Sequence, residues 1–359
     1  MKVLMQRSAV LIGISTVAAL LAVACGRENT SAVVAANEKA AAPAAAPPQA
    51  SKGAVTATIA PEDIAPPASR TGGFDGQKAY EYTAKLVSFG PRPPGSDAIR
   101  QTQSYIARQL KGFGCSVDAD DFHAPTPIGD LAMKNIVAKI PGAGRGIILL
   151  MTHYDTIRLP GFVGADDGGS SSGLMLEMAR VLCGNKTKSS NSVWIAFVDG
   201  EEDQQNFTTA QEAQNTWNDP DTTYGSRELA ARMELSGDLK RTRALILADM
   251  VGQKNLRVQP EANSTKWLSD LVWQTAARLG YKDVFVPAEI GGIVDDHGPF
   301  LKRGVPSVDV IELGGYMPGS DMPYWHTTQD TMDKLSPQSL AITGHVILES
   351  VSELQRKFK

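Results

Sequence analysis

The sequence predicts an α/β protein with a mixed, largely parallel central sheet flanked by helices. Two observations lead to this fold class. Short runs of strand length are almost continuously apolar, which is typical of central strands covered on both faces. Helical patterns separate these runs, as expected when helices connect the strands of a parallel sheet. The runs lie at residues 147–152, 193–198, 244–248 and 305–311.

The predicted helices begin with two segments that precede the first apolar run. Helices are expected over residues 80–88 and 98–113, with a break at Gly90-Pro91-Arg92-Pro93-Pro94-Gly95-Ser96. The last helix has the clearest start, because Ser336 can cap it and Pro337 suits its first position. The remaining helical stretches are residues 172–182, 226–235, 265–279 and 337–357.

The N-terminal part reads as an export signal followed by a tether. Lys2 and Arg7 precede an apolar run from Ala9 to Ala24, which is short for a membrane span and typical of a signal segment. The run ends in Leu-Ala-Val-Ala-Cys, which resembles a lipoprotein signal with Cys25 as the lipidated residue; an ordinary cleaved signal is the alternative. We therefore expect a signal over residues 1–25 and a lipid anchor that holds an exported protein on a membrane, facing the periplasm or the cell surface.

Composition limits the remaining possibilities. Residues 26–72 are rich in Ala and Pro with few large apolar side chains, which predicts a flexible tether before a catalytic domain at 73–359. The net charge of −4 and the scattered Lys and Arg residues argue against a nucleic-acid partner. The sequence leaves the oligomeric state open. It also cannot decide whether Cys115 and Cys183 are bonded, because it does not fix the distance between them.

Five separated segments place histidine or carboxylate residues where strands are expected to end. Ligands in open α/β sheets gather at the carboxyl ends of strands, and two His with several carboxylates suit a hydrolytic-type zinc centre. The segments are Thr152-His153-Tyr154-Asp155, Gly164-Ala165-Asp166-Asp167-Gly168, Asp199-Gly200-Glu201-Glu202, Leu247-Ala248-Asp249 and Trp325-His326-Thr327.

Two pairs of adjacent acids carry most of this prediction. Neighbouring side chains on an extended segment point in opposite directions, so one of Glu201 and Glu202 can bind metal while the other moves protons. A solvated acidic turn is the ordinary alternative. Asp166 and Asp167 precede a helix, and N-capping requires one Asp, which leaves the other for metal.

The histidines differ in their expected roles. We expect His153 and His326 in the site. His123 and His345 read as ordinary polar residues, and His297 falls between these two groups.

Together these segments resemble the zinc-dependent glutaminyl-peptide cyclotransferases of the animal type, which share a fold with the zinc aminopeptidases. The resemblance runs from about Ala79 to the C-terminus. The motifs more particular to the cyclases are Tyr224-Gly225-Ser226-Arg227, Asp295-Asp296-His297 with Pro299-Phe300-Leu301, and Trp325-His326. Residues 203–216 form a longer insertion than in those enzymes, and Asp309 stands where they carry His.

The resemblance implies specific roles. Asp167, Glu202 and His326 would bind one zinc ion, and Glu201 would be the proton shuttle. The other implied residues are Asp249 and Asp295 as an acidic pair near the leaving group, and Trp217 and Trp325 as walls of the substrate pocket.

The implied activity is cyclisation of N-terminal Gln in peptides or proteins to pyroglutamate, with release of ammonia. A di-zinc aminopeptidase remains an alternative, in which His153 and Asp249 would bind a second zinc and Glu201 would activate water. A metal-free binding lipoprotein on the same fold is a third possibility. A protein of that kind would lack some of the ligand residues, and this sequence contains all of them.

Overall fold

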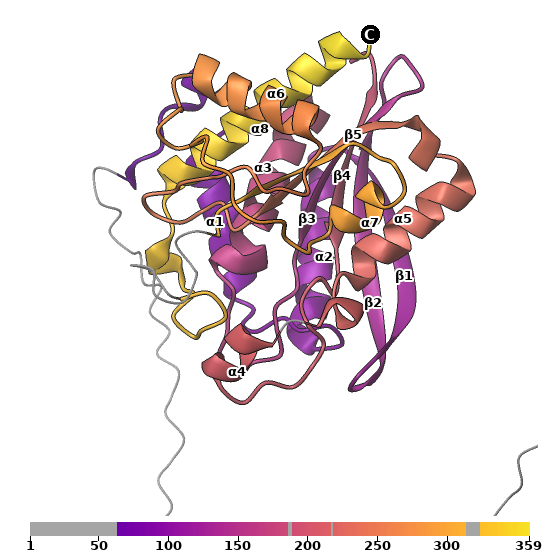
Figure 1. The fold of residues 1–359 in the computed structure, drawn as a ribbon, viewed down its shortest axis with the longest axis vertical. Coiled ribbons are helices and arrows are strands. Elements are labelled where there is room, and N and C mark those ends of the chain that lie inside the picture. The colour runs from indigo at the N-terminus through magenta and orange to yellow at the C-terminus, as the bar shows by residue number, and fades with distance from the viewer. Residues whose placement is uncertain (1–62, 186–188, 217, 314–323) are drawn as a thin grey trace, which may run out of the picture. The chain divides into compact units, whose positions relative to one another are not determined.

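The computed structural model describes residues 63–185, 189–216, 218–313 and 324–359. One sheet of six strands runs through the described part, in the order β1-β2-β4-β3-β5-β6 (Figure 1). Strands β4, β3, β5 and β6 are mutually parallel, whereas β2 runs antiparallel to both β4 and β1. The predicted fold class, α/β with a mixed and largely parallel sheet, is therefore confirmed.

The four apolar runs form the four parallel strands. They are β3 (Ile147–His153), β4 (Ser192–Val198), β5 (Thr242–Asp249) and β6 (Ser307–Ile311). Strand β6 begins two residues later than expected from the apolar run. Pro306 has no N–H to donate to a neighbouring strand, and its carbonyl accepts from Leu245 N just before the ladder starts.

A long antiparallel pair of strands, which the apolar runs in the sequence do not predict, forms one edge of the sheet. Strands β1 (Ser116–Thr126) and β2 (Gly129–Ile140) pair along their whole length. Only two residues of β1 are buried, Asp120 and Ala124, so the strand shows no apolar run. Its edge position explains this composition, because one face and one edge contact water.

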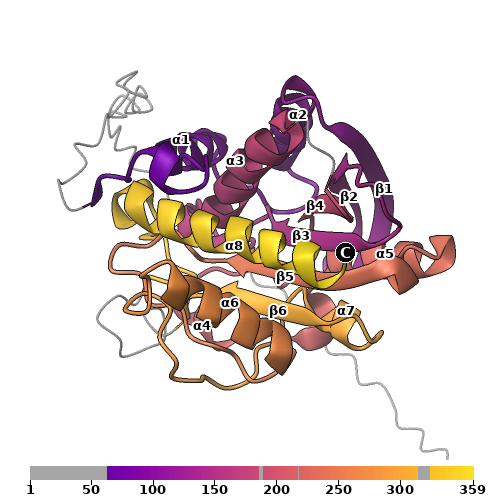
Figure 2. The same cartoon turned by 90° about the horizontal axis from the view of Figure 1, so that it is seen from above.

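Helices cover both faces of the sheet, and each face has its own apolar core. Along β3, Ile148 and Leu150 face one core while Leu149 and Met151 face the other, following the two-residue period of a strand. The first core lies under α1 (Gly76–Val87), α2 (Asp97–Gly112), α3 (Ser171–Gly184), α6 (Lys266–Arg278) and α8 (Pro337–Lys357). The second lies under α5 (Tyr224–Ser236) and α7 (Gly298–Leu301), and Figure 2 shows these helices on the opposite side of the sheet from α8.

Helix α8 confirms a predicted helix start, and a short helix lies near the site. Helix α8 has the predicted bounds, and the Ser336 hydroxyl accepts from the N–H groups of Gln338 and Ser339 at 3.2 and 3.4 Å. The short α4 (Ala210–Asn215) lies within the insertion that follows Glu202.

No helix in the described residues is long and apolar enough to cross a bilayer. The predicted signal segment and Cys25 lie outside the described residues.

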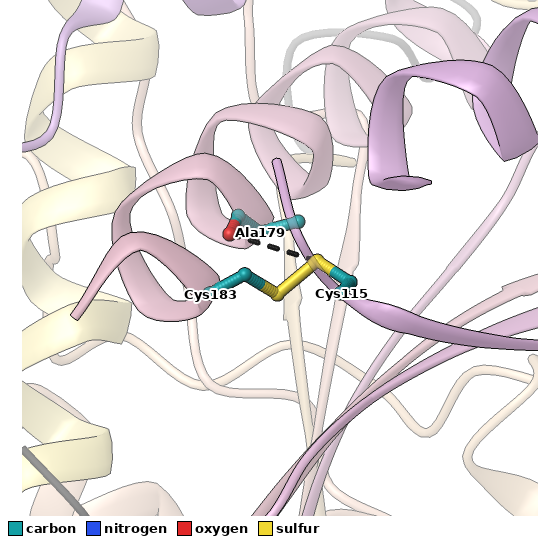
Figure 3. Close-up of a disulfide and its surroundings, with 3 residues drawn as sticks. All are labelled: Cys115, Ala179 and Cys183. Atoms are coloured by element: carbon teal, nitrogen blue, oxygen red, sulfur yellow. Dashed lines mark hydrogen bonds between the residues drawn. A yellow bond between two sulfur atoms is a disulfide. The ribbon is translucent and has the colours of Figure 1, made fainter. Parts of the chain in front are cut away.

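Cys115 and Cys183 form a disulfide, which answers the question that the sequence left open. Their Cα atoms are 5.3 Å apart, and the bond joins the residue before β1 to the last turn of α3 (Figure 3). The two cysteines are 68 residues apart in the chain. A loop of this length gives a stabilisation of about 4 kcal/mol in the chain-entropy treatment of cross-links. The bond therefore pins the edge hairpin to the main helical layer.

Candidate metal centre and active site

Three parallel strands deliver the candidate site residues to one edge of the sheet. His153 is the last residue of β3, Asp249 is the last residue of β5, and Glu201 and Glu202 follow β4 after a turn at Asp199 and Gly200. The side chains of all four candidates are at most 8% exposed. The carboxyl ends of parallel neighbouring strands lie at the same end of the sheet. Residues almost a hundred positions apart in the chain therefore meet in space.

Asp167 sits in a tight turn before α3 that brings its carboxylate between two histidines. Its Oδ1 lies 3.4 Å from His153 Nε2, and its Oδ2 lies 3.5 Å from His326 Nε2. Gly168 makes the turn possible, with φ of +70°. A Cβ at this position would come within 2.6 Å of the Asp155 carbonyl oxygen, so no other residue fits without movement.

The neighbouring Asp166 does not cap α3, contrary to the sequence-based expectation for one member of this pair. The helix starts only at Ser171, and no side chain among the described residues caps it. Instead, the Asp166 carboxylate accepts from Gly252 N at 2.8 Å, which ties the turn to the segment after β5. The Asp330 carboxylate accepts from the N–H groups of Asp166 and Asp167 at 2.8 and 3.1 Å. Both acids therefore fix the turn that presents Asp167.

The adjacent glutamates separate as expected from an extended segment. Glu202 Oε2 lies 3.2 Å from His326 Nε2, whereas Glu201 Oε2 approaches His153 Nδ1 at 3.9 Å. The Asp155 carboxylate accepts from the backbone N–H of Glu201 at 3.1 Å and of Glu202 at 3.4 Å. Asp155 thereby positions the backbone of both glutamates, a role that its place in the sequence did not reveal.

His326 is held in an unusual backbone conformation with its two ring nitrogens facing different partners. Its φ is +53°, a region that few residues other than glycine adopt. Nδ1 lies 3.2 Å from the carbonyl oxygen of Ala213 in α4, which makes Nδ1 the donor and leaves Nε2 facing Asp167 and Glu202. The Trp325 ring stacks on the imidazole with centroids 3.9 Å apart.

The donor set of Asp167, Glu202 and His326 fits a metal ion. One ligand atom from each of the three lies within 4.8 Å of the others. No hydrogen-bond donor with ordinary geometry reaches either oxygen of the buried Glu202 within the described chain. Two carboxylates and an imidazole whose other nitrogen donates to a carbonyl form the environment that protein zinc sites use.

A second group shares Asp167 with the first. His153, Asp167 and Asp249 also place one ligand atom each within 4.8 Å of the others. His153 Nε2 lies 3.0 Å from Asp249 Oδ1, so these two residues already contact each other directly. The structure thus brings together both ligand sets that the sequence suggested, with Asp167 common to the two.

A cavity of about 460 Å³ opens onto this centre. Its lining includes Glu201, Asp249 and Asp295 beside the three candidate ligands, and Trp325 with Ile293 and Val294 supplies apolar surface. Trp217, the other expected wall, lies outside the described residues. A larger hollow of about 740 Å³ lies between α6 and the end of α8, and none of the candidate site residues that the structure describes lines it.

Burial and mutual repulsion raise the pKa values of several acids around this cavity. Burial raises the pKa of Glu201 well above its usual value, and Asp295 and Glu202 add to the rise while His153 opposes it. Burial, helped by the Asp249 carboxylate, raises the pKa of Asp295 to about 6. Such shifts are typical of acids in catalytic sites.

Arg92, which the sequence places only in a helix break, holds two loops of the site together. Its side chain is almost completely buried and donates from Nε to Tyr154 O at 2.9 Å, from Nη1 to Val163 O at 2.5 Å and from Nη2 to Gly164 O at 2.9 Å. These carbonyls belong to the two loops that carry His153 and Asp167. The only signal in the sequence was an arginine inside a Gly- and Pro-rich turn.

The chain shares its sequence and its fold with known proteins. The family model for Peptidase family M28 matches residues 135–351. The chain belongs to peptidase family M28. This M28 chain is 30% identical over 292 residues to a glutaminyl-peptide cyclotransferase-like protein of Mus musculus, covering 73% of this chain and 72% of the mouse protein.

Solved structures agree with the sequence relatives. A glutaminyl cyclase of an Acidobacteriales bacterium is 38% identical to the M28 chain with a TM-score of 0.72, covering 79% of this chain and 96% of that structure. A Zn-dependent exopeptidase of Parabacteroides distasonis is 29% identical with a TM-score of 0.68, covering 77% and 97% of the two chains. The resemblance to glutaminyl-peptide cyclotransferases on a zinc aminopeptidase-like fold is therefore confirmed.

Proposed function

We propose that the chain is a zinc-dependent glutaminyl-peptide cyclotransferase, which converts N-terminal Gln of peptides or proteins to pyroglutamate and releases ammonia. One observation carries this proposal beyond the family relationship. The candidate ligands Asp167, Glu202 and His326 line the same cavity as Glu201, Asp295 and Trp325. The candidate ligands, a carboxylate that can carry a proton and an apolar surface thus line one cavity, which supports the proposal.

The reaction needs no nucleophile from the protein. The substrate's own α-amine attacks the carbonyl carbon of its Gln side chain, a C–N bond forms in the ring, and the bond to the amide nitrogen breaks. Bound zinc would supply Lewis-acid polarisation of that carbonyl. Because both reacting groups belong to one residue, the main task of the protein is to hold them in the attacking geometry.

Glu201 is suited to carry the proton that this reaction moves. It takes a proton from the attacking amine and passes it to the nitrogen that leaves as ammonia. Its buried carboxylate lies beside the candidate ligands without being a member of either triad. Burial raises the pKa of Glu201, which makes its carboxylate a stronger base than that of a solvated glutamate.

Asp249, Asp295 and Trp325 complete the proposed pocket. Asp249 and Asp295 both line the cavity, and their acidic groups suit hydrogen bonds to the leaving nitrogen. Trp325 gives a rigid apolar surface directly beside His326. The two acids thus bind the departing group while the tryptophan confines the side chain.

The number of metal ions separates this proposal from a second candidate function. The triad of His153, Asp167 and Asp249 favours a di-zinc aminopeptidase, since Asp167 is positioned to bridge two ions. We propose one zinc at this centre, because His153 Nε2 and Asp249 Oδ1, the two atoms that would face a second ion, already contact each other at 3.0 Å.

The decisive experiment is a product assay. The purified domain is incubated with peptides that begin with Gln or with Leu and are otherwise identical. We expect ammonia and a pyroglutamyl peptide from the first, and no reaction with the second. Release of free Leu or free Gln would support the aminopeptidase instead.

We also propose that the protein is exported and anchored to a membrane through lipid on Cys25. The support comes from the apolar segment and the Leu-Ala-Val-Ala-Cys sequence. A disulfide between Cys115 and Cys183 is compatible with an oxidising compartment.

A further inference from the structure

The insertion that follows Glu202 reaches back to the active site through the end of its short helix. Helix α4 lies at the foot of the view in Figure 1. The carbonyl oxygen of Ala213, in its last turn, faces Nδ1 of His326 at 3.2 Å. The next residue, Gln214, donates from Nε2 to the carbonyl oxygen of Trp325 at 2.8 Å. Gln214 also lines the catalytic cavity, although it has no part in the cyclisation described above.

Trp325 and His326 are the two central residues of a tight turn. The N–H of Thr327 donates to the carbonyl oxygen of Tyr324 at 3.0 Å, which closes the turn. The φ of His326 is +53°, whereas that of Trp325 is not positive. This combination is that of a type II turn, in which the third residue is usually glycine and the middle peptide group is turned over relative to a type I turn. Gln214 donates to the carbonyl of that middle peptide group, so its hydrogen bond favours the type II orientation.

The orientation of the turn decides where the His326 side chain points. Nε2 of His326 lies 3.5 Å from Oδ2 of Asp167 and 3.2 Å from Oε2 of Glu202. A positive φ strains a residue that has a Cβ, so the turn without an outside contact would relax toward the type I form, in which φ at this position is negative. That change would rotate the Cα–Cβ bond of His326 and carry its ring away from both carboxylates.

Helix α4 is anchored firmly enough to hold the turn. Its six residues are too few for a stable isolated helix, so contacts with the rest of the chain must stabilise it. The side chain of Thr209 caps its first turn. Phe207 and Ala213 are buried and pack in one apolar cluster with Phe162, which lies in the loop after β3. The amide of Gln214 therefore projects from a fixed element.

We propose that Gln214 is a positioning residue, which holds the Trp325–His326 turn so that His326 can bind zinc beside Asp167 and Glu202. This inference rests on the proposed function, because that proposal makes His326 a zinc ligand. The same hydrogen bond keeps the Trp325 ring at the cavity, where it stacks on the imidazole with centroids 3.9 Å apart. Loss of the amide donor should therefore disturb the metal centre although every ligand is still present.

The zinc affinity of two matched variants of α4 tests the proposal. Gln214→Met keeps the length of the side chain and removes its N–H groups. Gln211→Met is the control, because Gln211 is exposed one turn earlier on the same helix. Each folded protein is stripped with a chelator and titrated with zinc chloride against a zinc buffer.

We expect Gln214→Met to bind zinc about 10- to 100-fold more weakly than the wild type, because outer partners of a metal ligand typically contribute this much to affinity. Gln211→Met should bind zinc as the wild type does. Wild-type affinity in Gln214→Met, or an equal loss in both variants, would overturn the proposal.

Cobalt separates the positioning of a ligand from a general loss of stability. With cobalt(II) chloride at saturation in place of zinc, the visible absorption spectrum reports how the ligands are arranged and not how tightly they bind. The spectrum of Gln214→Met should differ from that of the wild type in wavelength or intensity, and the spectrum of Gln211→Met should match it. Identical spectra for all three proteins would contradict the proposal.

A second variant keeps the test open if Gln214→Met does not fold. Gln214→Asn retains the amide but is one methylene shorter, so it cannot reach the Trp325 carbonyl from the same position, and the same results are expected of it. Neither measurement needs a substrate. Failure of the proposed function would be seen separately, as free Leu in the product assay or as zinc retained in His326→Ala.

Discussion

The Nε2 atom of His153 lies 3.0 Å from Oδ1 of Asp249, at the junction of β3 and β5. In a dinuclear peptidase centre this pair would hold the second metal ion. In a cyclase the same pair serves as a direct polar contact that positions Asp249 at the cavity. Burial alone disfavours the charged imidazole of His153. The carboxylates of Asp249, Asp155 and Asp167 outweigh this effect and raise the pKa of His153 well above its ordinary value.

Replacing His153 by Ala should therefore leave the zinc count per chain unchanged and reduce cyclisation only modestly. The reason is that His153 positions an acid and is not a metal ligand in the proposed enzyme. Metal analysis and the product assay on wild type and His153→Ala check this. Loss of one zinc together with loss of peptide cleavage would establish the aminopeptidase reading.

The His326→Ala change should remove the catalytic zinc and abolish cyclisation together. His326 supplies the only imidazole in the set with Asp167 and Glu202, and two carboxylates alone bind zinc weakly. His123→Ala is the matched control, because that histidine is exposed on β1 and pairs only with Asp130 among the described residues. Zinc content and turnover are measured on both, and an active His326→Ala protein with full zinc would refute the ligand assignment.

Glu201→Gln should lower kcat roughly a hundredfold or more while zinc stays bound. The change keeps the shape of the side chain and removes its capacity to carry a proton. Glu234→Gln on α5 is the control, since Glu234 is exposed and pairs with Arg303 on the surface. Near-normal turnover in Glu201→Gln would mean that another group moves the proton.

The sequence was sufficient for the parts of the fold that depend on local pattern. Continuous apolar runs identified β3, β4, β5 and β6, and the ends of these strands located the candidate site. Strand β1 was not predicted, because its exposed position at the edge of the sheet leaves it without an apolar run. The helix cap expected of the acid pair was wrong at Asp166, because the turn at Gly168 moves the start of α3 to Ser171.

Long-range contacts explain what else the sequence could not provide. Asp155 acts on backbone groups 46 and 47 positions away, and Arg92 reaches carbonyls up to 72 positions away. The disulfide between Cys115 and Cys183 depends on a distance that only the folded chain defines. Such contacts leave no periodic trace along the chain, so the residues that position the site are harder to recognise than those that line it.

Cys25→Ser should move the protein from the membrane fraction to the soluble fraction. The thiol of Cys25 is the expected attachment point for lipid, and serine cannot accept a thioether-linked lipid. Fractionation of cells that express the wild type and the variant, followed by detection of the catalytic domain, measures this. A wild-type protein that is already soluble would contradict the lipid-anchor prediction.

Arg92→Lys should destabilise the protein even in the absence of metal. The guanidinium group satisfies three buried carbonyls, of Tyr154, Val163 and Gly164, in a fork geometry that a lysine ammonium cannot reproduce. Each buried carbonyl left unpaired costs about 1–3 kcal/mol, so the free energy of unfolding should fall by roughly 2–5 kcal/mol. Chemical unfolding of the chelator-treated protein measures this change without a contribution from bound zinc.

The matched control for this last change is Arg100→Lys, because Arg100 is largely exposed on α2 and pairs with Asp97 at the surface. That variant should change the free energy of unfolding by no more than about 0.5 kcal/mol. If Arg92 positions the loops of His153 and Asp167, Arg92→Lys should also weaken zinc binding relative to Arg100→Lys at a temperature where both proteins are folded. The affinity should fall because loops that have moved cannot hold their zinc ligands in place as well. Equal zinc affinity in the two variants would limit Arg92 to a role in stability.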